Sequence, residues 1–129
     1  MLFAHWMLLV ASLLPIVAVA TAKLNGGKFD NHNPRDFLEN LRPGSFAKRM
    51  SAAQGNSWEA LMMFAPAVLI ATHYHVAAST LNVLAGVFIA SRLVFLYCYA
   101  KDLATARSLV WMLGLCAVIG LYIAAALVV

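Results

Sequence analysis

Long apolar stretches separated by short polar segments are the feature that most constrains this chain. The first stretch runs from about Leu2 to Ala22, and further stretches occupy most of residues 46–74, 80–99 and 106–128. A hydrophobic run of about 20 residues is long enough to cross a bilayer as an α-helix. Because lipid cannot satisfy exposed backbone polar groups, such runs are expected to form a helical bundle in the membrane.

The composition argues against a soluble fold. Hydrophobic residues make up 64% of the 129 residues and charged residues only 11%, whereas soluble domains carry about a quarter charged residues. The net charge of +4 does not indicate nucleic-acid binding, because the basic residues lie beside apolar spans, where membrane topology accounts for them. We predict one all-α integral membrane domain over residues 1–129, with four transmembrane helices at 2–22, 46–74, 80–99 and 106–128.

The first apolar span has an alternative interpretation as a cleavable signal peptide. Small residues near its end, among them Ala18 and Ala20, are typical of a cleavage site. A signal peptide also needs a positively charged segment before the apolar run, and no Lys or Arg precedes this one. We therefore expect a retained transmembrane helix.

Residues 23–45 form the one long polar segment of the chain. Turn signals lie at Asn25-Gly26 and Pro43-Gly44, and Ser45 is a suitable cap for the helix that follows. This loop and the loop after the third span carry nearly all the Lys and Arg residues, which predicts that both are cytoplasmic and that both termini lie outside.

Two residue types that often mark special sites do not do so here. His73 and His75 lie in a short connection without a further ligand nearby, so we predict no metal site. Cys98 and Cys116 lie within apolar spans, so no disulfide framework is expected.

Two charged residues inside the spans call for partners. Glu59 lies about 20 Å, and Arg92 about 18 Å, from the outer end of its own span, given the rise per residue of a helix. A lone charge at such a depth costs on the order of 3 kcal/mol. The similar depth predicts a Glu59–Arg92 ion pair, either for packing alone or within a site. Arg49 and Asn56 share the helix face of Glu59, at steps of seven and three residues.

The start of the fourth span combines a cation with a hydroxyl group. Arg107 and Ser108 lie in its first turn, where the helix dipole is positive. This arrangement suits the binding of an anion such as a carboxylate, a phosphate or a thiolate. Membrane topology alone also favours an Arg at this position. On the third span, Arg92, Phe95 and Tyr99 share one face.

The order and spacing of these features resemble the MAPEG family, membrane-associated proteins in eicosanoid and glutathione metabolism. The resemblance covers nearly the whole chain and extends to bacterial-type members of the family, which implies a bacterial inner membrane as the location. It rests on four spans, a basic loop after the first, and the following motifs: Asp30-Asn31-His32-Asn33-Pro34-Arg35, Asn56-x-x-Glu59, Tyr97 with Tyr99, and Arg107-Ser108.

The resemblance implies a four-helix bundle that assembles as a homotrimer and binds glutathione as a co-substrate. The expected cofactor-binding residues are Asn56, Glu59, Tyr99, Arg49 and Arg92. Arg107 and Ser108 are the expected catalytic pair, which would stabilise the glutathione thiolate while it attacks a hydrophobic small molecule dissolved in the bilayer.

Two functions follow from this resemblance. One is a glutathione transferase or peroxidase that acts on lipophilic electrophiles. The other is a non-catalytic MAPEG-like scaffold or lipid-binding protein. The feature that favours the second is Ala52, because catalytic members usually carry an Arg one turn before the Asn of the Asn-x-x-Glu motif, and Gly55 and Phe95 also replace residues that are often His or basic.

Overall fold

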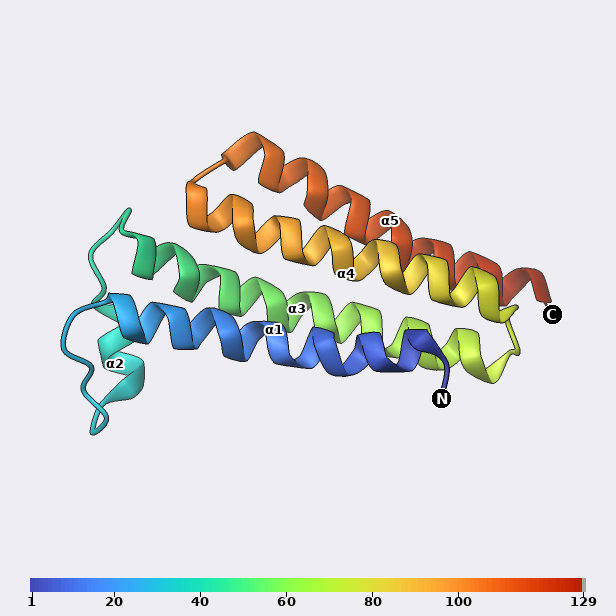
Figure 1. The fold of residues 1–129 in the computed structure, drawn as a ribbon, viewed down its shortest axis with the longest axis horizontal. Coiled ribbons are helices and arrows are strands. Elements are labelled where there is room, and N and C mark those ends of the chain that lie inside the picture. Colours follow the sequence, from blue (N-terminus) through green and yellow to red (C-terminus); the bar gives the residue numbers. More distant parts are fainter. Residues whose placement is uncertain (129) are drawn as a thin grey trace.

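A computed structural model of the chain describes residues 1–128, and four long helices form nearly all of its mass (Figure 1). The helices are α1 (Phe3–Asn25), α2 (Pro34–Glu39), α3 (Phe46–His73), α4 (Ala78–Lys101) and α5 (Ala104–Val128). The prediction of an all-α membrane fold is confirmed. α1, α4 and α5 are each long and apolar enough to cross a bilayer. α3 has 28 residues but a more polar first half.

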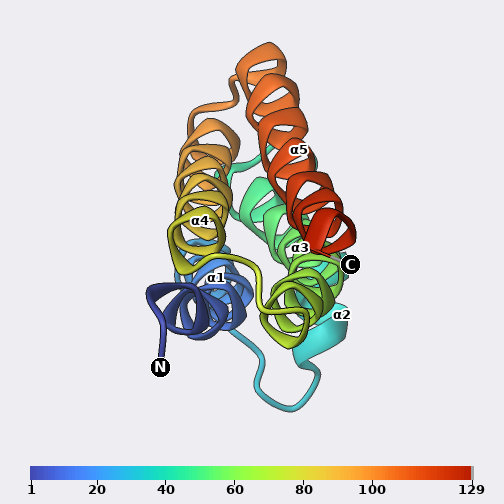
Figure 2. The same cartoon turned by 90° about the vertical axis from the view of Figure 1, so that its right-hand side faces the viewer.

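The helices pack as two antiparallel pairs. α1 lies along α3 and α4 lies along α5, and the two pairs stack on each other (Figures 1 and 2). Both ends of the chain lie at the end of the bundle where α3 connects to α4, whereas α2 and the α4–α5 connection lie at the opposite end (Figure 1). The functional residues expected from the sequence lie nearer that opposite end.

Small residues allow α1 and α3 to approach closely. In lipid, where no hydrophobic drive brings helices together, close backbone contact through small side chains is a main source of association. Both helices bury a row of alanines at the contact: Ala4, Ala11, Ala18 and Ala22 on α1, and Ala53, Ala60, Ala67 and Ala71 on α3. Between α3 and α4, the rings of Phe64 and Phe88 stack with centroids 3.9 Å apart.

The polar connection after α1 is partly helical, which the sequence did not lead us to expect. The six residues of α2 begin with Pro34 and carry Asp36 in the first turn, a favourable start for a helix. The next helix begins as predicted, because the Ser45 side chain accepts a hydrogen bond from the Lys48 N–H. The Lys48 ammonium in turn donates to the carbonyls of Leu38 and Glu39 at the end of α2.

Side chains tie the first turn of α1 to its neighbours. Nδ1 of His5 accepts the Leu2 N–H at 3.1 Å, and its Nε2 lies 3.1 Å from the Thr72 hydroxyl. The Thr72 proton is already donated to a backbone carbonyl of α3, so Nε2 of His5 must carry the donor proton of this pair. Asn82 of α4 accepts a backbone N–H of the same turn.

Gly114 of α5 lies against α4 with no space for a side chain. A Cβ atom added there would lie 2.7 Å from the Ser91 hydroxyl, and the next contact would be at 3.8 Å. Ser91 is buried and donates to the Phe88 carbonyl at 2.6 Å, so its oxygen cannot move without loss of that bond. The packing of α4 on α5 therefore requires glycine at position 114.

We expect Gly114→Ala to lower stability by about 1–3 kcal/mol, the usual cost of overpacking. The double variant Gly114→Ala/Ser91→Ala should recover most of this loss, because it removes the clashing oxygen. Gly55→Ala is the matched control, since Gly55 lies in α3 with nothing within 4 Å of its added Cβ; it should stabilise by about 0.5–1 kcal/mol. Thermal unfolding in detergent measures all three, and equal effects of the two single alanine variants would contradict the assignment.

Candidate functional site

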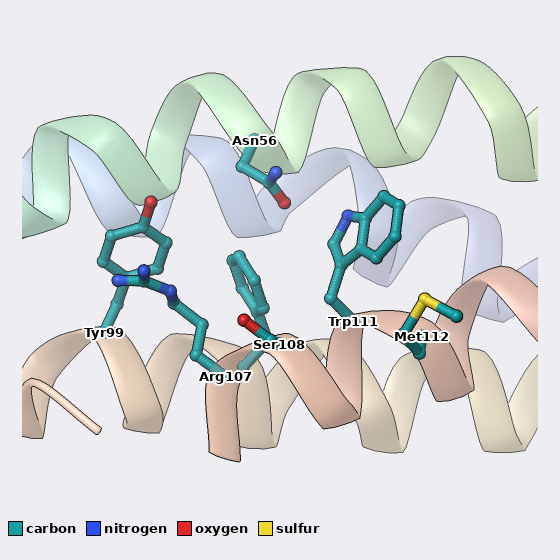
Figure 3. Close-up of a pocket in the computed structure, with 7 residues that line it drawn as sticks. Asn56, Tyr99, Arg107, Ser108, Trp111 and Met112 are labelled. Carbon is teal, nitrogen blue, oxygen red and sulfur yellow. The ribbon is translucent and has the colours of Figure 1, made fainter. Parts of the chain in front are cut away.

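A cavity of about 400 Å³ opens between α3, α4 and the start of α5 (Figure 3). Its volume lies within the range of about 300–1,000 Å³ that is typical of small-molecule sites. The lining residues are Asn56, Phe95, Tyr99, Arg107, Ser108, Trp111 and Met112. Four of the seven residues predicted from the sequence are therefore brought together here, one from α3, one from α4 and two from α5.

Arg107 is held over an aromatic ring at the mouth of the cavity. Its Cζ lies 4.4 Å from the ring centroid of Tyr99 (Figure 3). Tyr99 in turn packs edge to face with Phe95, with centroids 5.1 Å apart. A guanidinium that stacks on a ring with its flat face keeps the N–H groups along its edge available for hydrogen bonds to a ligand. The aromatic pair thus orients a cation beside the space that a ligand would occupy.

Ser108 follows Arg107 on the exposed side of the first turn of α5. Its hydroxyl donates to the Ala104 carbonyl at 3.2 Å, and the side chain is exposed to the cavity. Arg107 and Ser108 are the fourth and fifth residues of α5, and the Arg107 N–H already donates to the Leu103 carbonyl at 2.9 Å. The free backbone N–H groups of the helix start lie just before them and make this end of the helix positive. The arrangement attracts an anion.

Arg92 lies behind the cavity and is only 3% exposed. One guanidinium nitrogen, Nη2, donates to Oδ1 of Asn56 at 2.9 Å and lies 3.4 Å from the Ser57 hydroxyl. Its Cζ lies 3.9 Å from the ring centroid of Phe95, and its Nε has no hydrogen-bond partner within the described residues. Because the Asn56 oxygen is engaged by Arg92, the amide NH₂ is the part of Asn56 that remains for a ligand.

The predicted ion pair between Glu59 and Arg92 is wrong, because Arg92 is bound by other residues. In residues 1–128 the partners of Arg92 are Asn56 and Ser57, and the Glu59 side chain is exposed and does not line the cavity. Neutral acceptors therefore compensate the buried cation.

Arg49 also lies outside the cavity. Its guanidinium donates to three backbone carbonyls, those of Tyr99 at 2.9 Å, Ala100 at 3.1 Å and Gly44 at 2.8 Å. The last carbonyls of a helix have no partner within it, so Arg49 satisfies the end of α4 and joins it to Gly44, two residues before the start of α3. Through its hydrogen bond to the Tyr99 carbonyl, Arg49 helps to hold the backbone of Tyr99 in place.

We expect Arg49→Met to cost about 1.5–3 kcal/mol, the usual range for hydrogen bonds to a charged group. The end of α4 should loosen, and the Arg107–Tyr99 stack with it. Arg42→Met is the matched control, because Arg42 is an exposed cation of the same polar connection. Thermal unfolding should separate the two variants, and equal transition temperatures would contradict the proposed support.

Three residues of the cavity were not singled out as site residues from the sequence. Phe95, Trp111 and Met112 form its apolar wall. The signal was present in the spacing, because Trp111 and Met112 each follow a predicted site residue, Arg107 and Ser108, by four positions on one helix. Met112 is 51% exposed on the outer surface, so the cavity has an apolar side that faces the surroundings of the bundle.

The fold and the site together define a multi-pass, all-helical membrane protein with a cationic cavity near one end of the bundle. The model of the MAPEG family matches residues 3–127, and the chain belongs to the MAPEG family. The family is associated in general with glutathione-related transferase and peroxidase roles in membranes. Searches among curated proteins and among solved structures find no match.

Proposed function

We propose that this protein is a membrane glutathione transferase that binds glutathione in the cavity of Arg107 and Tyr99. The observation that carries the proposal is the guanidinium of Arg107, stacked at 4.4 Å on Tyr99 at the positive start of α5. A cation held there stabilises a thiolate, which is the reactive form of a thiol. Asn56 would donate its free NH₂ to a carbonyl of the tripeptide.

In the proposed reaction the glutathione sulfur attacks an electrophilic carbon. A carbon–sulfur bond forms while the bond to the leaving group breaks, and the leaving group departs with the electron pair. With a lipid hydroperoxide, the thiolate sulfur would bond to the terminal oxygen while the O–O bond breaks, and the lipid alkoxide would leave and take up a proton from water. The sulfenic acid of glutathione formed in this step would react with a second glutathione to give glutathione disulfide and water. Both reactions need a thiolate held by fixed donors in a site of restricted water.

The hydrophobic co-substrate would reach the sulfur from the bilayer. Trp111 and Met112 form the apolar wall of the cavity, and Met112 is half exposed on the outside of the bundle. A lipophilic electrophile can therefore approach without crossing the polar mouth. This supports a substrate that partitions into lipid.

By the same resemblance we propose a homotrimer in a bacterial inner membrane, with the α2 end of the bundle in the cytoplasm. The sequence supports this orientation because Lys and Arg are concentrated in the α1–α3 and α4–α5 connections. Glu59 would then act in assembly, and Arg49 would support the end of α4 through its hydrogen bonds; neither would line the cavity of its own protomer.

A non-catalytic scaffold or lipid-binding protein is the second candidate. Ala52 favours it, because this exposed position on α3 lacks the Arg that catalytic members usually carry there. Phe95 favours it too, since it supplies no hydrogen-bonding group to the cavity. In this alternative, Arg107 would only help to set the orientation of the helices in the membrane, as basic residues at helix ends do.

Calorimetric titration of the purified protein with glutathione in detergent decides between the two. We expect saturable heat, with S-methylglutathione binding more weakly because it lacks the thiolate. Ultraviolet difference spectra should show that the pKa of bound glutathione falls below that of a free thiol, about 8.5. Absence of heat at millimolar glutathione, from protein shown to be trimeric, would contradict the enzyme.

A further inference from the structure

A second cavity, of about 490 Å³, lies on the other side of α3. It is formed where the end of α1, the short α2 and the first half of α3 meet. Its lining residues are Val19, Lys23, Pro34, Arg35, Leu38, Gln54 and Trp58. Gln54 and Trp58 are four residues apart and share a helix face, whereas Asn56 of the first cavity points away from that face. The two cavities are therefore separate.

The polar side of this cavity carries two cations and no acidic residue. Lys23 comes from the last turn of α1 and Arg35 from α2, and none of the residues that line the cavity is Asp or Glu. The Lys23 ammonium is held 4.8 Å from the ring centroid of Phe29, a contact that leaves its charge uncompensated. Arg35 is exposed. An anion is the ligand that these charges select.

The remaining wall is apolar and lies at the level of the membrane boundary. Lys23 is the first charged residue after the apolar run of α1, so the cavity extends from the interfacial region towards the hydrocarbon. Val19 of α1 lines that deeper side, Leu38 closes the cavity from α2, and Trp58 of α3 is 44% exposed. Trp is typical of the membrane–water interface because its ring is apolar and its N–H is polar.

We propose that this cavity binds an anionic phospholipid. The headgroup phosphate pairs with Lys23 and Arg35, Gln54 hydrogen-bonds a headgroup oxygen, and the acyl chains follow Val19 and Trp58 into the bilayer. Anionic headgroups attract basic residues close to the membrane surface at about 1 kcal/mol per residue. The assignment requires neither glutathione nor catalysis, so it stands or falls separately from the proposed enzyme activity.

Native mass spectrometry of the detergent-solubilised full chain tests it, with added dihexanoyl phosphatidylglycerol or dihexanoyl phosphatidylcholine and no glutathione. We expect about thirtyfold tighter binding of the anionic lipid, the effect of two basic residues at about 1 kcal/mol each. Lys23→Ala/Arg35→Ala should reduce this preference to less than about threefold. Lys28→Ala/Arg42→Ala, which removes two exposed cations of the same connection that do not line the cavity, should keep it. Trp58→Ala should weaken both lipids alike.

Several results would overturn the proposal. Equal affinity of the wild-type protein for the two lipids would do so, as would equal loss of preference in both double variants. A competition experiment with inorganic phosphate tests whether the cavity binds a lipid headgroup or free phosphate. Displacement of the anionic lipid by phosphate at micromolar concentration would assign the cavity to free phosphate, whereas retention of the lipid at millimolar phosphate supports the lipid.

Discussion

Replacement of Arg107 with alanine is expected to lower kcat/KM for glutathione conjugation by about a hundredfold to a thousandfold. Removal of one fixed donor to a developing or stabilised anion costs about that much in other enzymes. Arg107 is the cation that the structure places at the cavity, 4.4 Å from the Tyr99 ring centroid and in the first turn of α5. Most of the loss should appear in kcat at low pH, where thiolate formation limits the reaction.

Three further variants distinguish a catalytic role of Arg107 from a role in membrane orientation or in folding. Arg107→Lys keeps the positive charge but loses the planar fork, so an intermediate rate is expected. Tyr99→Phe keeps the ring beneath the guanidinium and should stay close to wild type. Lys101→Ala removes an exposed cation of the same connection outside the cavity and should be fully active. Activity of Arg107→Ala within about threefold of wild type would contradict the proposed thiolate role, since a fixed donor is worth far more.

The class of fold could be predicted from the sequence because a membrane leaves so few solutions. Apolar runs of about 20 residues allow little other than helices, and the family model covers residues 3–127. α2 was missed because six residues that contain a Pro resemble a turn as much as a helix. Its stability comes from Lys48, which donates to two carbonyls at its end from ten and nine residues away in the sequence.

The candidate site could be predicted in part. Arg107, Ser108, Tyr99 and Asn56 converge because helix spacing and short connections put them at one end of the bundle. The prediction of a Glu59–Arg92 pair was wrong because it compared only how deep the two residues lie in the membrane. The direction in which each side chain points around its own helix axis was not determined by that comparison. Asn56 lies three residues and Ser57 two residues before Glu59 on α3, so they point in other directions around the helix, and these two residues face Arg92. Arg49 shared a face with Asn56 but lies two turns away, where it meets the end of α4.

Loss of Asn56 should destabilise the protein more than loss of the buried charge that it binds. Asn56→Ala would leave Arg92 with one long hydrogen bond of 3.4 Å, to Ser57, among the described residues, while the side chain stays 3% exposed. An unsatisfied buried charge costs roughly 3 kcal/mol or more. Arg92→Met removes the charge and fills similar space, so its cost should be about 1 kcal/mol or less, as for other buried ions replaced by apolar residues.

The double variant Asn56→Ala/Arg92→Met makes the argument quantitative. If the cost of Asn56→Ala is the stranded cation, the double variant should be more stable than Asn56→Ala alone, a coupling of about 2 kcal/mol. Gln54→Ala is the matched control, because Gln54 is another carboxamide of α3 that lines the cavity on the opposite side. Thermal unfolding in detergent measures each variant. Additive effects, or a more stable Asn56→Ala than Arg92→Met, would show that Asn56 does not hold the charge of Arg92.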